Sequence, residues 1–163
     1  MAIPYPRGFF NVAYCERVFL YLPDRLAALR ELQRVVRPGG SICVVDTDFD
    51  TMAIYSSQRE LTRKVISTVA AAIPNPNSAR ELPALARLVG LDDIQVEPLT
   101  ARTPYRFMVH AMEGVLRQAV ERGVIGKAEF DEWWDEQARL QENGDFFLAR
   151  MFVRIIAKVR KRA

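Results

Sequence analysis

"CERVFLYLPDRLAALRELQRVVRPGGSICVVDTDFD", residues 15–50, contains the pattern that decides the fold. Asp24 follows a proline and is a favoured N-cap for the helix after it, whose leucines and valines form one apolar stripe. Pro38-Gly39-Gly40 then predicts the end of that helix. Residues 41–46 (SICVVD) and 9–15 (FFNVAYC) are short apolar runs typical of strands buried on both faces. Strand, helix and strand at this spacing predict a right-handed parallel crossover.

The rest of the chain continues as alternating helices and strands. We expect a loop or a short helical start after Asp46, because aspartate is frequent in turns. Apolar periodicity predicts helices over 58–73, 79–90, 105–122 and 126–144, and strands over 94–99 and from Phe147 onward. No repeat, low-complexity segment or linker is visible, so we predict one α/β domain over residues 1–163.

Composition excludes several classes of protein. The net charge of +3 arises largely from the basic end RIIAKVRKRA, which predicts a solvated terminus and no nucleic-acid or membrane partner. One histidine and two separated cysteines cannot form a standard zinc site, so we expect no metal. We see no signal peptide and no apolar run of transmembrane length, and therefore predict a soluble, cytoplasmic protein.

The order of these motifs resembles the carboxyl-terminal portion of class I S-adenosylmethionine-dependent methyltransferases, of the type 11 or ubiquinone-biosynthesis-like group. PYPRGFFNVAYCERVFLYLPD (residues 4–24) resembles the family's run into its fourth strand, and ALRELQRVVRPGGSICVVD (28–46) its helix, glycine turn and fifth strand. GLDDIQV (90–96) resembles the sixth strand and GDFFLARMFVRIIAKVRK (144–161) the seventh. The resemblance implies a truncated Rossmann-like fold with strands four to seven, flanking helices and a helical cap.

Family members also carry a glycine-rich turn after strand one and an acidic residue after strand two, which together hold the cofactor. The sequence shows neither, so the resemblance implies a truncated or split form, inactive as an isolated chain. Strand Phe10–Cys15 would then be an unprotected apolar edge. We expect the chain to form a homodimer there, or to bind a complementary amino-terminal chain.

The resemblance places cofactor contacts at the end of strand four, on Cys15, Glu16 and Arg17, with S-adenosylmethionine as the cofactor. The residues also permit a plainer interpretation, in which Glu16 and Arg17 form a local ion pair. Tyr21 stands where many relatives have histidine, and is a candidate for the catalytic position or a helix-packing aromatic. Asn11 replaces the family's usual aspartate.

On the acceptor side the resemblance points to Asp48 as the carboxylate that orients a substrate, with Phe19 and Phe49 shaping the pocket. His110, the single histidine, is a candidate general base beside Tyr105 and Arg106, although a histidine in an apolar helix is more often simply packed. Caps and solvated loop carboxylates remain the alternative for Asp46, Asp48 and Asp50.

Two functions remain open at this point. The first is a small-molecule methyltransferase that needs a complementary amino-terminal half. The second is a non-catalytic, methyltransferase-derived protein that uses its exposed strand for dimerisation or partner binding. A fragment of an ordinary enzyme would give the same sequence pattern, and the methyl acceptor cannot be named from these residues.

Overall fold

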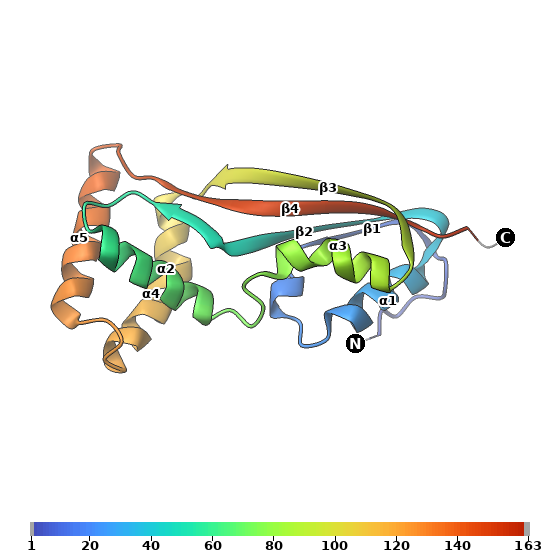
Figure 1. Cartoon of the computed structure of the whole chain (residues 1–163), viewed down its shortest axis with the longest axis horizontal. Helices are drawn as coiled ribbons and strands as arrows, with labels where there is room; N and C mark the ends of the chain where they lie inside the picture. Colours follow the sequence, from blue (N-terminus) through green and yellow to red (C-terminus); the bar gives the residue numbers. More distant parts are fainter. Residues whose placement is uncertain (1, 162–163) are drawn as a thin grey trace. The chain divides into compact units, whose positions relative to one another are not determined.

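The computed structural model describes residues 2–161 and has the predicted mixed α/β architecture (Figure 1). In chain order its elements are β1 (Phe10–Glu16), the 3-10 turn η1 (Phe19–Tyr21), α1 (Arg25–Val35), β2 (Val36–Ile54), α2 (Arg59–Ala71), α3 (Ser78–Leu88), β3 (Leu91–Arg102), α4 (Tyr105–Glu121), α5 (Lys127–Glu142) and β4 (Leu148–Val159). Within residues 2–161 no helix is both long and apolar enough to cross a bilayer.

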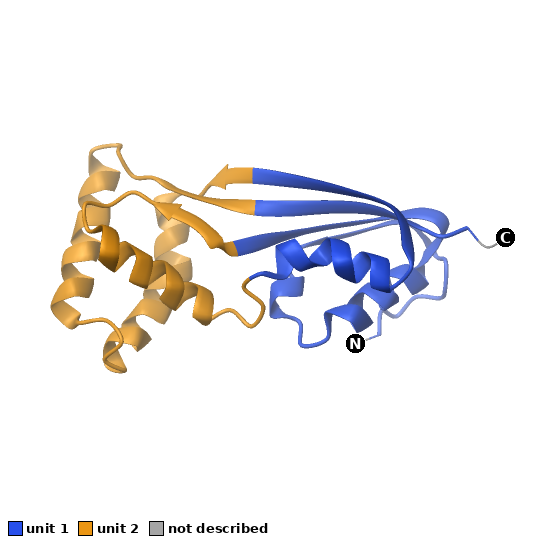
Figure 2. Ribbon diagram, viewed as in Figure 1, with its two compact units in different colours: residues 1–48, 77–99, 152–163 blue, residues 49–76, 100–151 orange. Residues whose placement is uncertain are grey.

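The chain divides into two compact units (Figure 2). Unit 1 comprises residues 1–48, 77–99 and 152–163, and unit 2 comprises residues 49–76 and 100–151. The prediction of a single domain stays a prediction.

The described strands form a four-stranded sheet in the order β1-β2-β4-β3. With β1 to β4 taken as the expected strands four to seven, this order reads four, five, seven, six. Strands β1 and β2 are parallel, as the crossover rule predicted, with Val12 opposite Ser41 and Cys15 opposite Val44. The carboxyl end of β1 therefore lies beside Val44 and Val45 in the middle of β2.

Local signals set the bounds of the connecting helix. The Asp24 carboxylate accepts a 2.8 Å hydrogen bond from the Ala27 amide and so caps α1, as predicted. After Val35 the chain turns directly into β2. Gly40 has no room for a side chain, because a Cβ there would lie 2.6 Å from the Asn11 carbonyl oxygen and 2.6 Å from Val36 Cγ1.

Helices α1 and α3 cover one face of the sheet of unit 1 (Figure 2). Leu29 of α1 and Leu82 of α3 are fully buried, as are Ile42 and Val44 of β2 and Ile155 of β4. Alternate residues of a strand point to opposite faces, so these strand residues mark the covered face. The core of unit 1 lies between that face and the two helices.

The expectation that strand 9–15 is buried on both faces was wrong. Val12 and Tyr14 of β1 are 57% and 61% exposed, and Phe9 just before the strand is 58% exposed. Val12 and Tyr14 point away from the face covered by α1 and α3, and β1 is an edge strand of the described sheet. The continuous apolar sequence predicted that both faces of this strand are covered. Among the described residues only one face is covered, by α1 and α3.

The expected loop after Asp46 is also absent. Strand β2 continues to Ile54. In unit 2 the Thr51 hydroxyl accepts a 2.9 Å hydrogen bond from the Met151 amide, and the Tyr55 amide donates to the Phe147 carbonyl at 3.0 Å. Pairing with a distant segment therefore overrides the turn preference of the aspartates.

Helices α2, α4 and α5 pack against one another in unit 2. Trp133 of α5 is fully buried, and its indole Nε1 donates a 2.9 Å hydrogen bond to the Thr62 hydroxyl of α2. Its neighbour Trp134 is partly exposed and stacks on Phe130, with ring centroids 5.5 Å apart. One tryptophan therefore anchors the helix, and the other lies at its rim.

These two adjacent tryptophans give a matched pair for a stability test. Trp133→Ala removes a buried ring and leaves a cavity, so we expect it to lower the free energy of unfolding by about 3–5 kcal/mol. Trp134→Ala should cost less than about 2 kcal/mol, because much of that ring is already hydrated. Urea unfolding of both variants measures the difference; equal losses would show that Trp133 is not the anchor.

Candidate functional site

The carboxyl end of β1 carries the three residues predicted to contact a cofactor. Arg17 has a φ of 53°, an uncommon left-handed conformation for a residue other than glycine. Its amide nevertheless donates a 2.8 Å hydrogen bond to the Val45 carbonyl of β2, which holds the turn in place. Backbone of this kind is concentrated at ligand sites, although it also occurs in ordinary tight turns.

Glu16 and Arg17 form the local ion pair that the plainer interpretation expected. The Glu16 carboxylate lies 3.3 Å from Arg17 Nε and accepts a 2.5 Å hydrogen bond from the Tyr14 hydroxyl. All three side chains are largely hydrated, so the pair contributes little to stability. The pair neutralises the charges that a ligand would otherwise meet at this turn.

Cys15 lies beside Glu16 at the end of β1, opposite Val44 of β2. Burial raises the pKa of its thiol to about 11, and the nearby Asp46 carboxylate adds to the rise. The thiol is therefore protonated and a poor nucleophile at neutral pH. Both cysteines of the chain are free.

Asp46 is the fully buried carboxylate at the end of the parallel pair. Burial raises its pKa, while the Ser78 hydroxyl, the backbone of Thr47 and Leu20 and the positive charge of Arg25 act in the opposite direction. Its Oδ1 accepts a 3.0 Å hydrogen bond from the Thr47 amide, and Oδ2 has no partner of good geometry within residues 2–161. An incompletely satisfied buried carboxylate marks this strand end as a polar centre inside an apolar core.

Asp48, the predicted acceptor-orienting carboxylate, is also buried and is held by Arg80 of α3. The guanidinium binds both carboxylate oxygens at 2.5 Å, Nε to Oδ2 and Nη2 to Oδ1. A bidentate pair of this kind fixes the carboxylate plane. Asp48 therefore faces a protein cation, and a ligand would have to compete with Arg80 for it.

Two aromatic candidates, Phe19 and Tyr21, lie just after the turn at Arg17. Phe19 is fully buried in unit 1, so it would reach a ligand only after movement of its neighbours. Tyr21 is 57% exposed at the end of η1. Of the two, only the Tyr21 side chain is presented to solvent.

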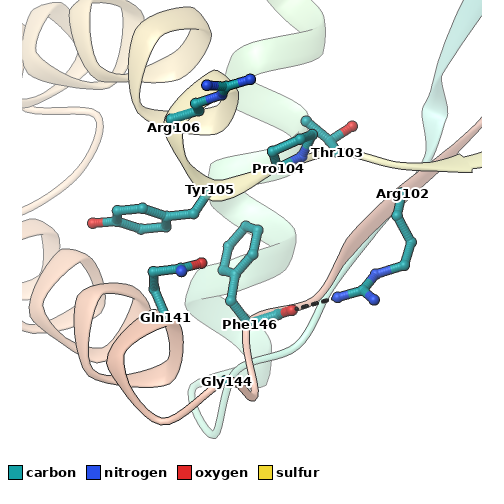
Figure 3. A pocket seen from close by; sticks show the side chains of 8 residues that line it. All are labelled: Arg102, Thr103, Pro104, Tyr105, Arg106, Gln141, Gly144 and Phe146. Carbon is teal, nitrogen blue, oxygen red and sulfur yellow. Dashed lines mark hydrogen bonds between the residues drawn. The ribbon is translucent and has the colours of Figure 1, made fainter.

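Tyr105 and Arg106 lie together in unit 2, where they line a cavity of about 540 Å³ (Figure 3). The other lining residues are Arg102, Thr103, Pro104, Gln141, Gly144 and Phe146. Tyr105 and Phe146 form an edge-on aromatic pair with ring centroids 5.3 Å apart. The volume lies within the range of small-molecule sites.

The remaining two candidates of unit 2 lie elsewhere. His110 is exposed on α4 and does not line this cavity. Phe49 is largely buried, and the guanidinium carbon of Arg150 lies 5.3 Å from its ring centroid. Tyr105 and Arg106 therefore share this cavity, whereas His110 lies outside it.

Sequence reasoning missed four polar residues of these two sites. Arg80 and Ser78 lie in α3, more than thirty residues beyond Asp46 and Asp48, and nothing in their local pattern indicates the contact. Arg102 and Gln141 come from β3 and α5 and meet only through the folded chain. No periodicity or motif could have identified them.

Comparison with known proteins bears on what these sites belong to. The family model of the methyltransferase domain matches residues 1–44. Demethylmenaquinone methyltransferase of Lactococcus lactis is 36% identical over 61 residues, which cover 37% of this chain and 24% of that protein. The 27-O-demethylrifamycin SV methyltransferase of Amycolatopsis mediterranei is 28% identical over 134 residues, covering 80% of this chain and 47% of that protein.

The fold has counterparts among solved structures. A solved structure from Bacillus halodurans, described as that of a methyltransferase, superposes with a TM-score of 0.55 and 11% identity, over 98% of this chain and 74% of that one. The class I methyltransferase resemblance is confirmed. The Rossmann-like methyltransferase fold is confirmed with it. The chain spans less than half of the length of the curated relatives it matches.

Methyltransferases of this class use S-adenosylmethionine, and the residues present fit only one side of that cofactor. The end of β1 offers a left-handed turn and exposed edge groups. The sequence contains no G-x-G-x-G turn to hold the amino-acid portion and no strand-two carboxylate for the ribose.

The environment of Cys15 gives a pH-dependent test of the site geometry. In a Cys43→Ser background, we expect alkylation by iodoacetamide to speed up with pH with a midpoint near pH 11, where half of the thiol is ionised. Asp46→Asn removes a negative charge that opposes the thiolate, so its pKa should fall and the curve should move to lower pH. Asp131→Asn, an exposed carboxylate of α5, should leave the curve in place; no movement in Asp46→Asn would contradict the proposed contact.

Proposed function

We propose that this chain is part of an S-adenosylmethionine-dependent methyltransferase that acts on a small molecule, and that it requires a second segment to bind the cofactor. The observation that carries the proposal is the open edge of β1, which lies beside the turn of Arg17. In the family this edge is where the cofactor-binding strands would follow. Without those strands the chain retains the carboxyl end of β1 but not the glycine-rich turn that holds the cofactor.

The hydrogen-bonding direction of β1 supports this proposal. The Arg17 amide donates to the Val45 carbonyl, and the Asn11 carbonyl lies close to Gly40. The backbone amides and carbonyls of the odd-numbered residues of β1 therefore point toward β2. In a parallel strand the even-numbered residues then point their amides and carbonyls outward. Val12 and Tyr14 therefore offer unpaired backbone groups and exposed apolar side chains at one edge.

An exposed edge with these properties favours strand addition. The partner is either a second copy of this chain or a separate chain carrying the glycine turn. Unit 1 then contributes the cofactor side of the enzyme, with Cys15, Glu16 and Arg17 at the strand end. Unit 2 contains a cavity lined by Tyr105 and Arg106, the residues expected to contact the acceptor.

A second function is favoured by the ion pairs of the candidate site. Asp48 is engaged by Arg80 and Glu16 by Arg17, so both candidate carboxylates are satisfied within the protein. A methyltransferase-derived protein that binds a partner through β1 without catalysis would retain the same edge. The two functions differ in whether the assembled protein binds S-adenosylmethionine.

A proline on the edge separates edge pairing from folding. Val12→Pro removes an outward-pointing amide, so we expect it to prevent assembly while the chain stays folded. Ala13→Pro removes an inward-pointing amide of the β1–β2 ladder and should destabilise the chain by about 3 kcal/mol or more. Sedimentation equilibrium measures the assembly, and a monodisperse wild-type monomer of ordinary thermal stability would contradict edge pairing.

Calorimetric titration with S-adenosylmethionine tests the cofactor requirement. We expect no saturable binding up to about 1 mM for the chain alone. Binding with Kd below about 100 μM should follow once the chain is complexed with an amino-terminal methyltransferase segment that carries the glycine-rich turn.

Each titration has a result that counts against the proposal. Micromolar binding by the monomeric chain alone would contradict the need for a second segment. Lack of binding by a complex whose formation is verified by sedimentation would contradict the methyltransferase and favour the non-catalytic alternative.

A further inference from the structure

The cavity at the start of α4 has features that define the chemistry of its ligand. Arg102, Thr103 and Pro104 lead into the helix, and Gln141, Gly144 and Phe146 come from the end of α5 and the turn before β4 (Figure 3). All of these residues lie in unit 2. At about 540 Å³ the cavity exceeds the volume of a single substituted ring, so a larger aromatic or bicyclic molecule also fits.

Its walls are aromatic. Phe146 is almost fully buried and presents its ring edge-on to Tyr105. Pro104 adds an apolar surface between Arg102 and the helix. A planar ring of a ligand can pack against such a pair in the offset or edge-on geometry that aromatic rings prefer.

Two guanidinium groups at the cavity lack a carboxylate partner. The Arg106 side chain makes no hydrogen bond or ion pair with another residue in the described range 2–161. Arg102 donates to the Phe146 carbonyl at 3.1 Å and lies 5.7 Å from the Phe147 ring centroid, which leaves its charge uncompensated. By contrast Arg117, further along α4, is paired with Glu113.

The other end of the cavity has a different polarity. Burial raises the pKa of the Tyr105 hydroxyl, and Glu113, Glu142 and Asp135 contribute to the rise. The hydroxyl therefore stays a neutral hydrogen-bond donor, and the same three carboxylates disfavour a ligand anion beside it. In Figure 3 the hydroxyl points away from Arg102, with Gln141 beside it. A negative group is thus favoured only near the arginines.

We propose that this cavity binds an aromatic carboxylate, with its ring packed against the Tyr105–Phe146 pair and its carboxylate at the guanidinium group of Arg106 or Arg102. Guanidinium is suited to the planar carboxylate, which it can bind through two parallel hydrogen bonds. A ring substituent such as a hydroxyl would meet Tyr105 and Gln141 at the far end. As an assignment of the methyl acceptor this inference rests on the proposed function, whereas ligand binding is a property of the chain alone.

Three probes of similar size separate the two components of recognition. Benzoate carries both ring and charge, benzamide keeps the ring without the charge, and cyclohexanecarboxylate keeps the charge without the aromatic ring. We expect saturation-transfer NMR of the full chain to show benzoate binding at least about ten-fold tighter than either analogue. Neither cofactor nor partner is added, so the result is independent of methyl transfer.

Variants of the cavity complete the test. Arg106→Gln should weaken benzoate binding about ten-fold, and Tyr105→Leu should weaken it while abolishing the preference over cyclohexanecarboxylate. Arg122→Gln removes the same charge at the other end of α4 and should have no effect.

Two results would overturn the proposal. One is equal binding of benzoate and benzamide, and the other is no benzoate binding at about 10 mM by chain that circular dichroism shows to be folded. If benzoate binds as expected but the assembled protein fails to bind S-adenosylmethionine, the aromatic carboxylate site stands and the methyltransferase does not.

Discussion

The parallel ladder between β1 and β2 is the constraint on which unit 1 depends. It brings Cys15, Arg17 and Asp46 close together, because the end of β1 pairs with Val44 and Val45 of β2. It also directs half of the backbone groups of β1 outward. The polar strand end and the open edge are therefore two consequences of a single pairing, and neither can be changed without the other.

Parallel pairing explains why the electrostatics of this edge are internally compensated. Asp46 and Asp48 leave the ladder inside the core, where an unpaired carboxylate is costly. Ser78 and Arg80 of α3 lie beside them, and the bidentate Arg80 pair turns Asp48 into a fixed structural group. A catalytic role for Asp48 would require that this pair be exchanged for a substrate contact.

The predictable part of the fold was the part encoded locally. Asp24 caps α1 through the next turn of chain, so its role can be read from a few neighbouring residues. The extension of β2 to Ile54 depends on Met151, a hundred residues away, and local turn preference misled the prediction. The sites show the same division: Tyr105 and Arg106 are neighbours in sequence, whereas Arg80, Arg102 and Gln141 arrive from separate elements. The exposure of Val12 and Tyr14 was missed because apolar side chains predict a buried strand, but they do not show which part of the protein covers it.

Gly40 has a consequence for how the sheet is assembled. The space beside the Asn11 carbonyl admits only a hydrogen atom, so strand slippage that placed Ser41 there would produce a steric clash. Slippage in the other direction would place Gly39 there without a clash, but it would turn Ile42 and Val44 from the core face to the open face. The missing side chain of Gly40 and the apolar alternation of β2 thus disfavour the two nearest incorrect registers of β1 against β2. The sheet can therefore select its correct register as the two strands pair.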